Sequence, residues 1–148
     1  MKKPIIIKLC TLNIICLTLL QMIYIIIEFF KENIATTVEL TQSQIMQQMH
    51  YSNIQSNFSR IIYICAFLAI LAIHVAIKEK KLDEILLINI IGITIMLSLS
   101  MLFTVLLKLN FGNVFENTIG FSIILIIFII IYLIRLYIRK NNFNKTTN

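Results

Sequence analysis

Four long apolar runs constrain this chain more than any other feature of its sequence. They occupy residues 9–30, 61–77, 85–107 and 119–138. A membrane-spanning helix needs about 20 mostly apolar residues, whereas a transmembrane strand alternates apolar and polar residues, which these runs do not. With 59% hydrophobic and 14% charged residues in a chain of 148, a soluble domain could not bury so much apolar side chain. We therefore predict an all-α integral membrane protein: one domain, a bundle of four transmembrane helices.

Basic residues are distributed unevenly around these runs. Ten of the thirteen precede the first run, separate the second from the third, or end and follow the fourth: Lys2, Lys3, Lys8, Lys78, Lys80, Lys81, Arg135, Arg139, Lys140 and Lys145. Only Lys31, Arg60 and Lys108 fall on the other side of a four-span arrangement. Because basic residues in short loops stay in the cytoplasm, we predict that both termini, the inner turn 78–84 and the tail 139–148 are cytoplasmic. We interpret the net charge of +6 as an orientation signal in a cell membrane, and we expect no nucleic-acid partner.

Polar side chains within the runs form stripes. In the first run, one arc of about 80° on a helical wheel holds Cys10, Asn13, Gln21, Tyr24 and Glu28. In the third run, a wider arc of about 120° holds Asn89, Gly92, Met96, Ser100 and Thr104. Polar groups are costly against lipid and so face the interior of a bundle. The candidate polar face of the bundle is therefore Asn13, Gln21, Glu28, Asn89, Ser100 and Thr104.

This face has two interpretations. Hydrogen bonds between helices would account for it, at roughly 0.6 to 2 kcal/mol per contact, and we favour this interpretation. A polar pathway for ions is the alternative, although several amides with one acid make a poor relay compared with a chain of carboxylates. Glu28 either reaches the headgroup region, pairs with Lys31, three residues on, or binds a coupling ion or substrate.

The second and fourth runs differ in side-chain size. The second carries small residues at helical spacings of three and four, which predicts a close helix-packing face of Cys65, Ala69, Ala72 and Ala76. The fourth is almost entirely bulky and aliphatic apart from Gly120 and Ser122. We expect the first three spans to form the core of the bundle and the fourth to lie at its edge.

The longest polar segment, residues 31–60, is predicted to be an outer loop, as is the shorter segment 108–118. Thr41 followed by Gln44 has the form of a capping box. A short amphipathic helix on the membrane surface or over the mouth of the bundle would follow this box, and the chain would turn back near Tyr51. The loop either contacts another protein or is a plain connector.

The sequence contains none of the motifs that would indicate an enzyme. It has no HExxH, GxSxG or Walker motif, and its single aspartate excludes a paired-aspartate intramembrane protease. The three cysteines lie inside apolar runs without CxxC spacing, so we expect free thiols and neither a metal nor another cofactor. We predict that the protein is not an enzyme and that its surroundings are lipid.

Three functional classes stay open. The layout of four spans with cytoplasmic ends, a long first outer loop and a short basic inner turn resembles that of the immunity proteins that protect bacteria from pore-forming colicins. This resemblance implies that the spans and the outer loop recognise a toxin or another membrane protein within the bilayer. A transporter or channel subunit would need a homo-oligomer, because four spans are few, and its spans would be broken by proline or glycine pairs. A holin, which permeabilises the membrane, shares the size and the basic tail.

Overall fold

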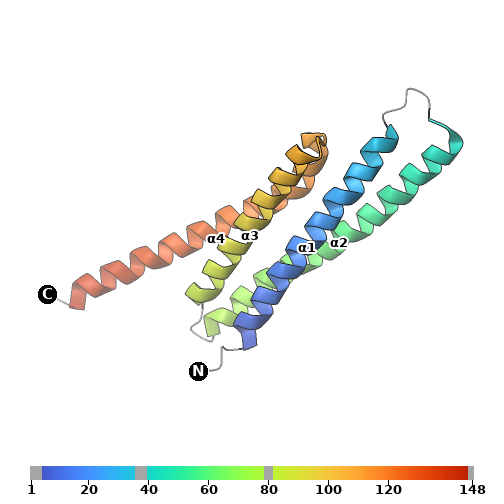
Figure 1. The fold of residues 1–148 in the computed structure, drawn as a ribbon. Helices are drawn as coiled ribbons and strands as arrows, with labels where there is room; N and C mark the ends of the chain where they lie inside the picture. Colours follow the sequence, from blue (N-terminus) through green and yellow to red (C-terminus); the bar gives the residue numbers. More distant parts are fainter. Residues whose placement is uncertain (1–4, 36–39, 79–81, 147–148) are drawn as a thin grey trace.

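The computed structural model describes residues 5–35, 40–78 and 82–146, and within them the chain forms four α-helices and no strand (Figure 1). The helices are α1 (Ile5–Ala35), α2 (Gln42–Lys78), α3 (Leu82–Leu106) and α4 (Phe111–Thr146). Each contains an apolar stretch long enough to cross a membrane. Even α3, with 25 residues, extends about 37 Å at 1.5 Å per residue. The prediction of an all-helical chain with four helices of membrane-spanning length is confirmed.

The helices run alternately in opposite directions, so both termini lie at the same end of the molecule (Figure 1). α1 lies between α2 and α3 and packs on both, whereas α4 packs mainly on α3. In the apolar stretch of α4 only 11% of the residues are buried, against 39% in α3. The expectation that the first three spans form the core and the fourth lies at the edge is confirmed.

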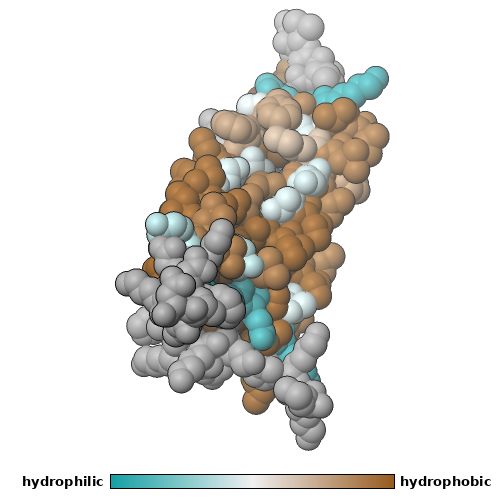
Figure 2. All heavy atoms as spheres, turned by 90° about the vertical axis from the view of Figure 1, so that its left-hand side faces the viewer, coloured by the Kyte–Doolittle hydropathy of each residue, from teal (hydrophilic) through white to brown (hydrophobic). Residues whose placement is uncertain are grey.

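The core consists mostly of large apolar side chains from α1, α2 and α3, to which α4 adds Phe121 and Phe128. At most 1% of the surface is exposed for Leu17, Ile25, Ile62, Ile85, Leu86 and Met96. At Gly92 the absence of a side chain lets α1 and α3 approach closely. A Cβ atom added there would lie only 2.3 Å from Ile14 Cγ2. Outside this core, apolar residues also cover most of the surface between the two ends of the molecule on the face shown in Figure 2. Such a surface suits lipid.

Helix α2 differs from the sequence-based expectation. The predicted outer loop 31–60 is mostly helical, since α1 continues to Ala35 and α2 is unbroken from Gln42 to Lys78. The predicted capping box is present: Thr41 N–H donates to Gln44 Oε1 at 2.8 Å, and Gln44 N–H donates to Thr41 Oγ1 at 3.4 Å.

The expected turn near Tyr51 was wrong because α2 contains neither glycine nor proline, and serine and asparagine cost a helix only a fraction of a kcal/mol each. Packing against α1 repays this cost. The ring of Tyr51 stacks on that of Phe30 at a centroid distance of 6.1 Å. The predicted amphipathic helix is therefore not a separate element. It is the first part of α2 and continues directly into the apolar stretch of the same helix.

The predicted outer loop 108–118 is a tight turn, because α4 already begins at Phe111. Lys108 adopts a left-handed backbone conformation with a φ of 55°. Lys108 N–H donates to Val105 O at 3.2 Å and Leu109 N–H to Thr104 O at 3.0 Å, which is the Schellman pattern for ending a helix. The Asn110 side chain then accepts a hydrogen bond from Gly112 N–H at 3.1 Å and caps the start of α4.

Candidate functional site: the buried polar face

The predicted polar face lies inside the helix bundle. At most 2% of the surface is exposed for Gln21 and Glu28 of α1 and for Asn89, Ser100 and Thr104 of α3, whereas Asn13 is half-buried. Gly92 and Met96, on the same arc of α3, are buried as well. The helical spacing of these residues thus corresponds to one continuous interior strip on each helix.

Glu28 is held at the contact between α1 and α2. Lys31 Nζ donates to Glu28 Oε2 at 2.7 Å, and Gln55 Nε2 donates to the same oxygen. Lys31 Nζ also donates to Gln55 Oε1 at 3.0 Å, which closes a ring of three hydrogen bonds. The Glu28 side chain is fully buried and that of Lys31 is 24% exposed. The negative charge of the buried carboxylate is therefore balanced by an ammonium group that reaches the surface of the bundle. This geometry agrees with the interpretation of Glu28 as the partner of Lys31.

The polar side chains of α3 bond to their own helix. Asn89 Nδ2 donates to Ile85 O at 2.8 Å, Ser100 Oγ to Met96 O at 2.8 Å, and Thr104 Oγ1 to Ser100 O at 2.7 Å. These bonds run from each residue to the carbonyl four positions earlier and do not cross between helices. The favoured interpretation, hydrogen bonding between helices, therefore describes α1 but not these bonds of α3.

Asn13 makes the contact between helices that was expected of this face. Its Nδ2 donates to Cys65 O of α2 at 2.9 Å. Such a bond uses a backbone oxygen already engaged in the helix, so it ties α1 to α2 without opening either helix.

The predicted small-residue face of α2 also points inward. Ala69 is buried, and Cys65 and Ala72 are half-buried against the main core. The side chain of Ala76 lies outside the described part of the structure. Ala66, which the sequence interpretation left out, is 7% exposed and joins the same core.

Two further polar contacts between elements lie at the ends of the molecule. At one end, both carboxylate oxygens of Glu32 accept from Asn110 N–H at 3.0 Å, which links α1 to the turn between α3 and α4. At the other end, Asp83 of α3 pairs with Arg135 at 2.5 Å and with Arg139 at 3.0 Å, both from α4. The side chains of the two arginines are 44% and 74% exposed, so these pairs lie at the surface.

Gln55 is the site residue that sequence reasoning missed. It was assigned to a loop, and so its position on a helical face was not considered. On one continuous helix, a single arc of about 80° contains Tyr51, Gln55, Phe58, Ile62, Ala66 and Ala69. Reading α2 as unbroken from its capping box would have placed Gln55 on the same face of α2 as Tyr51, Ile62 and Ala69.

In the part of the chain that the structure describes, the cysteines are unpaired and no group of metal-ligating side chains is found. Cys10, Cys16 and Cys65 are all free. Within residues 5–35, 40–78 and 82–146, no three histidine, cysteine or acidic side chains gather as they would around a metal ion. Within the buried polar face, Asn13 and Glu28 make the hydrogen bonds that join α1 to α2.

Comparison of the chain with protein-family models, with curated proteins and with solved structures found no match.

Proposed function

We propose that the four helices cross a bacterial cell membrane with both termini in the cytoplasm. Lys8 and Glu28 of α1 are separated by 28 − 8 = 20 positions, or about 30 Å of helix, which matches the thickness of the hydrocarbon core. The apolar stretch of α4, Thr118–Arg139, has 22 residues and extends about 33 Å. The excess of basic residues at the end that holds both termini supports a cytoplasmic position for that end.

Helix α2 extends beyond this layer on the side away from the termini. Gln42 precedes Gln55, the partner of Glu28, by 55 − 42 = 13 positions, so α2 continues for about 20 Å past the level of that carboxylate. Residues 42–57 include no Asp, Glu, Lys or Arg.

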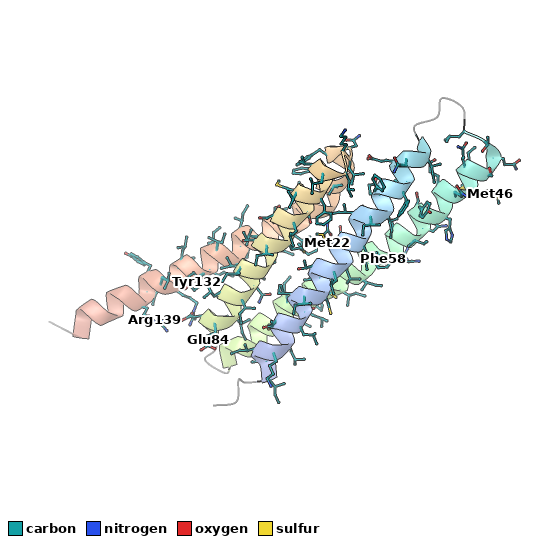
Figure 3. The ribbon with its side chains drawn as sticks, viewed as in Figure 1. Met22, Met46, Phe58, Glu84, Tyr132 and Arg139 are labelled. Atoms are coloured by element: carbon teal, nitrogen blue, oxygen red, sulfur yellow. The ribbon has the colours of Figure 1, made fainter. Side chains whose placement is uncertain are left out.

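This projecting part of α2 carries an exposed apolar surface. Ile45, Met46 and Met49 are 44%, 68% and 65% exposed, and we call these three residues the methionine surface. Met46 lies in the first turns of α2 (Figure 3). The centres of protein interfaces are depleted of charge and enriched in methionine, whose flexible side chain adapts to a partner.

We infer that the protein acts by protein–protein contact in or at the membrane, as an immunity protein against a pore-forming toxin would. The methionine surface is the observation that carries this proposal. The paired state of Glu28 and the bonds of the α3 side chains to their own helix favour contact over transport, because an ion pathway needs polar groups that are able to exchange partners. The partner would be a toxin or another membrane protein, and neither a cofactor nor catalysis is involved.

The proposal is tested by expressing the chain in bacteria that are sensitive to a pore-forming toxin or bacteriocin, such as any that is encoded beside its gene, and challenging them with that toxin. Protection is expected, and a Met46→Glu/Met49→Glu variant should lose it while its amount in the membrane stays unchanged. Gln47→Glu is the matched control, because Gln47 is also exposed in this segment but lies on a different side of the helix.

Other outcomes would contradict the proposal. Lysis of the expressing cells without any toxin would indicate a holin. Altered solute uptake that survives the Met46→Glu/Met49→Glu change would indicate a transporter or channel subunit. Protection that persists equally in the double variant and in Gln47→Glu would show that the methionine surface is not the contact.

A further inference from the structure

The end of the molecule that holds both termini carries a cluster of three charges between α3 and α4, which we call the arginine cluster: Asp83, Arg135 and Arg139. Arg135 Nε donates to Asp83 Oδ1 at 2.5 Å, and Arg139 Nη2 lies 3.0 Å from Asp83 Oδ2. The two arginines are four positions apart and therefore lie on the same face of α4. Their side chains are 44% and 74% exposed. The cluster is therefore open to a group that approaches from outside the bundle.

The arginine cluster has an excess of positive charge and of hydrogen-bond donors. Two guanidinium groups face one carboxylate, so its formal charge is 2 − 1 = +1. A guanidinium group has five N–H donors, and among the described residues Asp83 engages one nitrogen of each arginine. The planar fork of N–H groups that remains suits the oxygens of a phosphate group. The complement of the cluster is therefore a phosphate group with one negative charge.

In the proposed crossing of the membrane, the arginine cluster lies at the level of the lipid headgroups. Arg139 is the last residue of the 22-residue apolar stretch of α4. The long stem of Arg135 lets its charged group reach the same level from one turn further inside. Tyr137, between the two arginines, is 67% exposed, as is typical of aromatic residues at a membrane interface. A phosphate group at this depth is that of a phospholipid.

The charge of this end of the chain discriminates between phospholipids. By sequence, the segments assigned to it carry ten basic residues and the acids Glu79, Asp83 and Glu84, a net charge of 10 − 3 = +7, whereas those assigned to the opposite end have 3 − 4 = −1. Phosphatidylcholine brings its own positive group and is neutral overall, but phosphatidylglycerol keeps the single negative charge of its phosphate. Basic residues beside a membrane favour such anionic lipids.

We propose that the arginine cluster binds the headgroup phosphate of an anionic phospholipid such as phosphatidylglycerol. Arg135 and Arg139 donate to the phosphate oxygens, and Asp83 limits the charge of the site to that of one lipid. This inference rests on the proposed crossing of the membrane and is independent of the proposed contact with a toxin.

The test uses tryptophan fluorescence, because the chain contains no tryptophan of its own. Tyr137→Trp places a reporter between the two arginines, and Phe111→Trp, at a 48% exposed position at the other end of α4, is the matched control. The purified full chain is reconstituted in vesicles of equal parts phosphatidylcholine and phosphatidylglycerol, one of which carries brominated acyl chains that quench a tryptophan in contact with them. At position 137 the association constant for phosphatidylglycerol should exceed that for phosphatidylcholine about fivefold, as expected from one excess basic group. At position 111 the two should be equal.

Variants of the arginine cluster localise the preference measured at position 137. Arg135→Gln and Arg139→Gln each leave the cluster without net charge and should abolish the preference. Asp83→Asn raises the charge to 2 − 0 = +2 and should strengthen the preference by about fivefold. Lys108→Asn is the control, because it removes a basic group at the opposite end of α3 and α4, in a left-handed conformation that asparagine tolerates. Helical circular dichroism of each variant shows whether it is folded.

Equal quenching by the two lipids at position 137 would overturn the lipid site and leave the crossing of the membrane intact. A weaker preference in Asp83→Asn would also overturn it, because the arginines would then act only as partners of the carboxylate. Displacement of the lipid by inorganic phosphate at constant ionic strength would indicate a site for soluble anions instead. If neither lipid quenched position 137, the crossing of the membrane would itself be contradicted. Failed protection against a toxin with the lipid preference intact would refute the proposed function and not the lipid site.

Discussion

Replacing Lys31 with methionine would test most sharply the buried polar contact between α1 and α2. Methionine keeps the length of the apolar stem but removes the ammonium group that bonds to both Glu28 and Gln55. The carboxylate of Glu28, fully buried, would then keep Gln55 as a donor but lose its neutralising charge. Removing one partner of a buried ion pair costs about 3–5 kcal/mol. Because Lys31 is 24% exposed, we expect the lower end, a loss of about 3 kcal/mol in the free energy of unfolding.

The measurement is the unfolding of the purified chain in mild detergent on titration with sodium dodecyl sulfate, followed by helical circular dichroism. A Glu28→Gln/Lys31→Met double variant has no charge left to bury, so it should regain at least about 1 kcal/mol relative to Lys31→Met alone. Lys8→Met makes the same change at an exposed lysine of the same helix and should cost less than about 0.5 kcal/mol. The reasoning is refuted if Lys31→Met costs no more than Lys8→Met, or if the double variant is the least stable of the three.

Three further predictions concern other contacts and use the same unfolding measurement. Gly92→Ala should destabilise the chain by about 1–3 kcal/mol, because the new Cβ would meet Ile14 at 2.3 Å and push α1 from α3; a neutral result would mean that the two helices are further apart. Lys108→Gly should stabilise the chain by about 1 kcal/mol, since glycine adopts the φ of 55° without strain; destabilisation would argue against the tight turn. Asp83→Asn should cost less than about 1 kcal/mol, because its partners Arg135 and Arg139 are exposed, and the difference should shrink in 1 M salt. A cost that does not respond to salt would place this pair away from solvent.

The features that were predictable from the sequence depend on local periodicity. Asn89, Ser100 and Thr104 lie within one arc of a helical wheel, and all three are buried. The bulky, nearly featureless fourth run indicated a helix with little to pack against, and α4 is the least buried helix. Both inferences need only the geometry of one helix and the cost of exposing polar groups to lipid.

The features that were missed depend on how helices meet. Ser52 and Asn53, which follow Tyr51, were interpreted as a turn. Packing of α2 against α1 outweighs their weak preference for non-helical structure. The bond from Gln55 to Glu28 follows from that packing, because the two residues are 27 positions apart. The pairs of Asp83 with Arg135 and Arg139 join α3 to α4, and their register depends on the length of the turn at Lys108, which no side-chain pattern specified.

The four-span arrangement is tested most directly by labelling single cysteines in intact cells with a membrane-impermeant maleimide. Cysteine replaces Met46 in one variant and Glu84 in the other, in a chain whose three native cysteines are changed to serine. These two residues are exposed and lie at opposite ends of the molecule (Figure 3). We predict that the cysteine at position 46 is labelled in intact cells and that the one at position 84 is labelled only after the membrane is permeabilised. Labelling of both positions in intact cells, or of position 84 alone, would contradict a bundle that crosses the membrane with its termini inside.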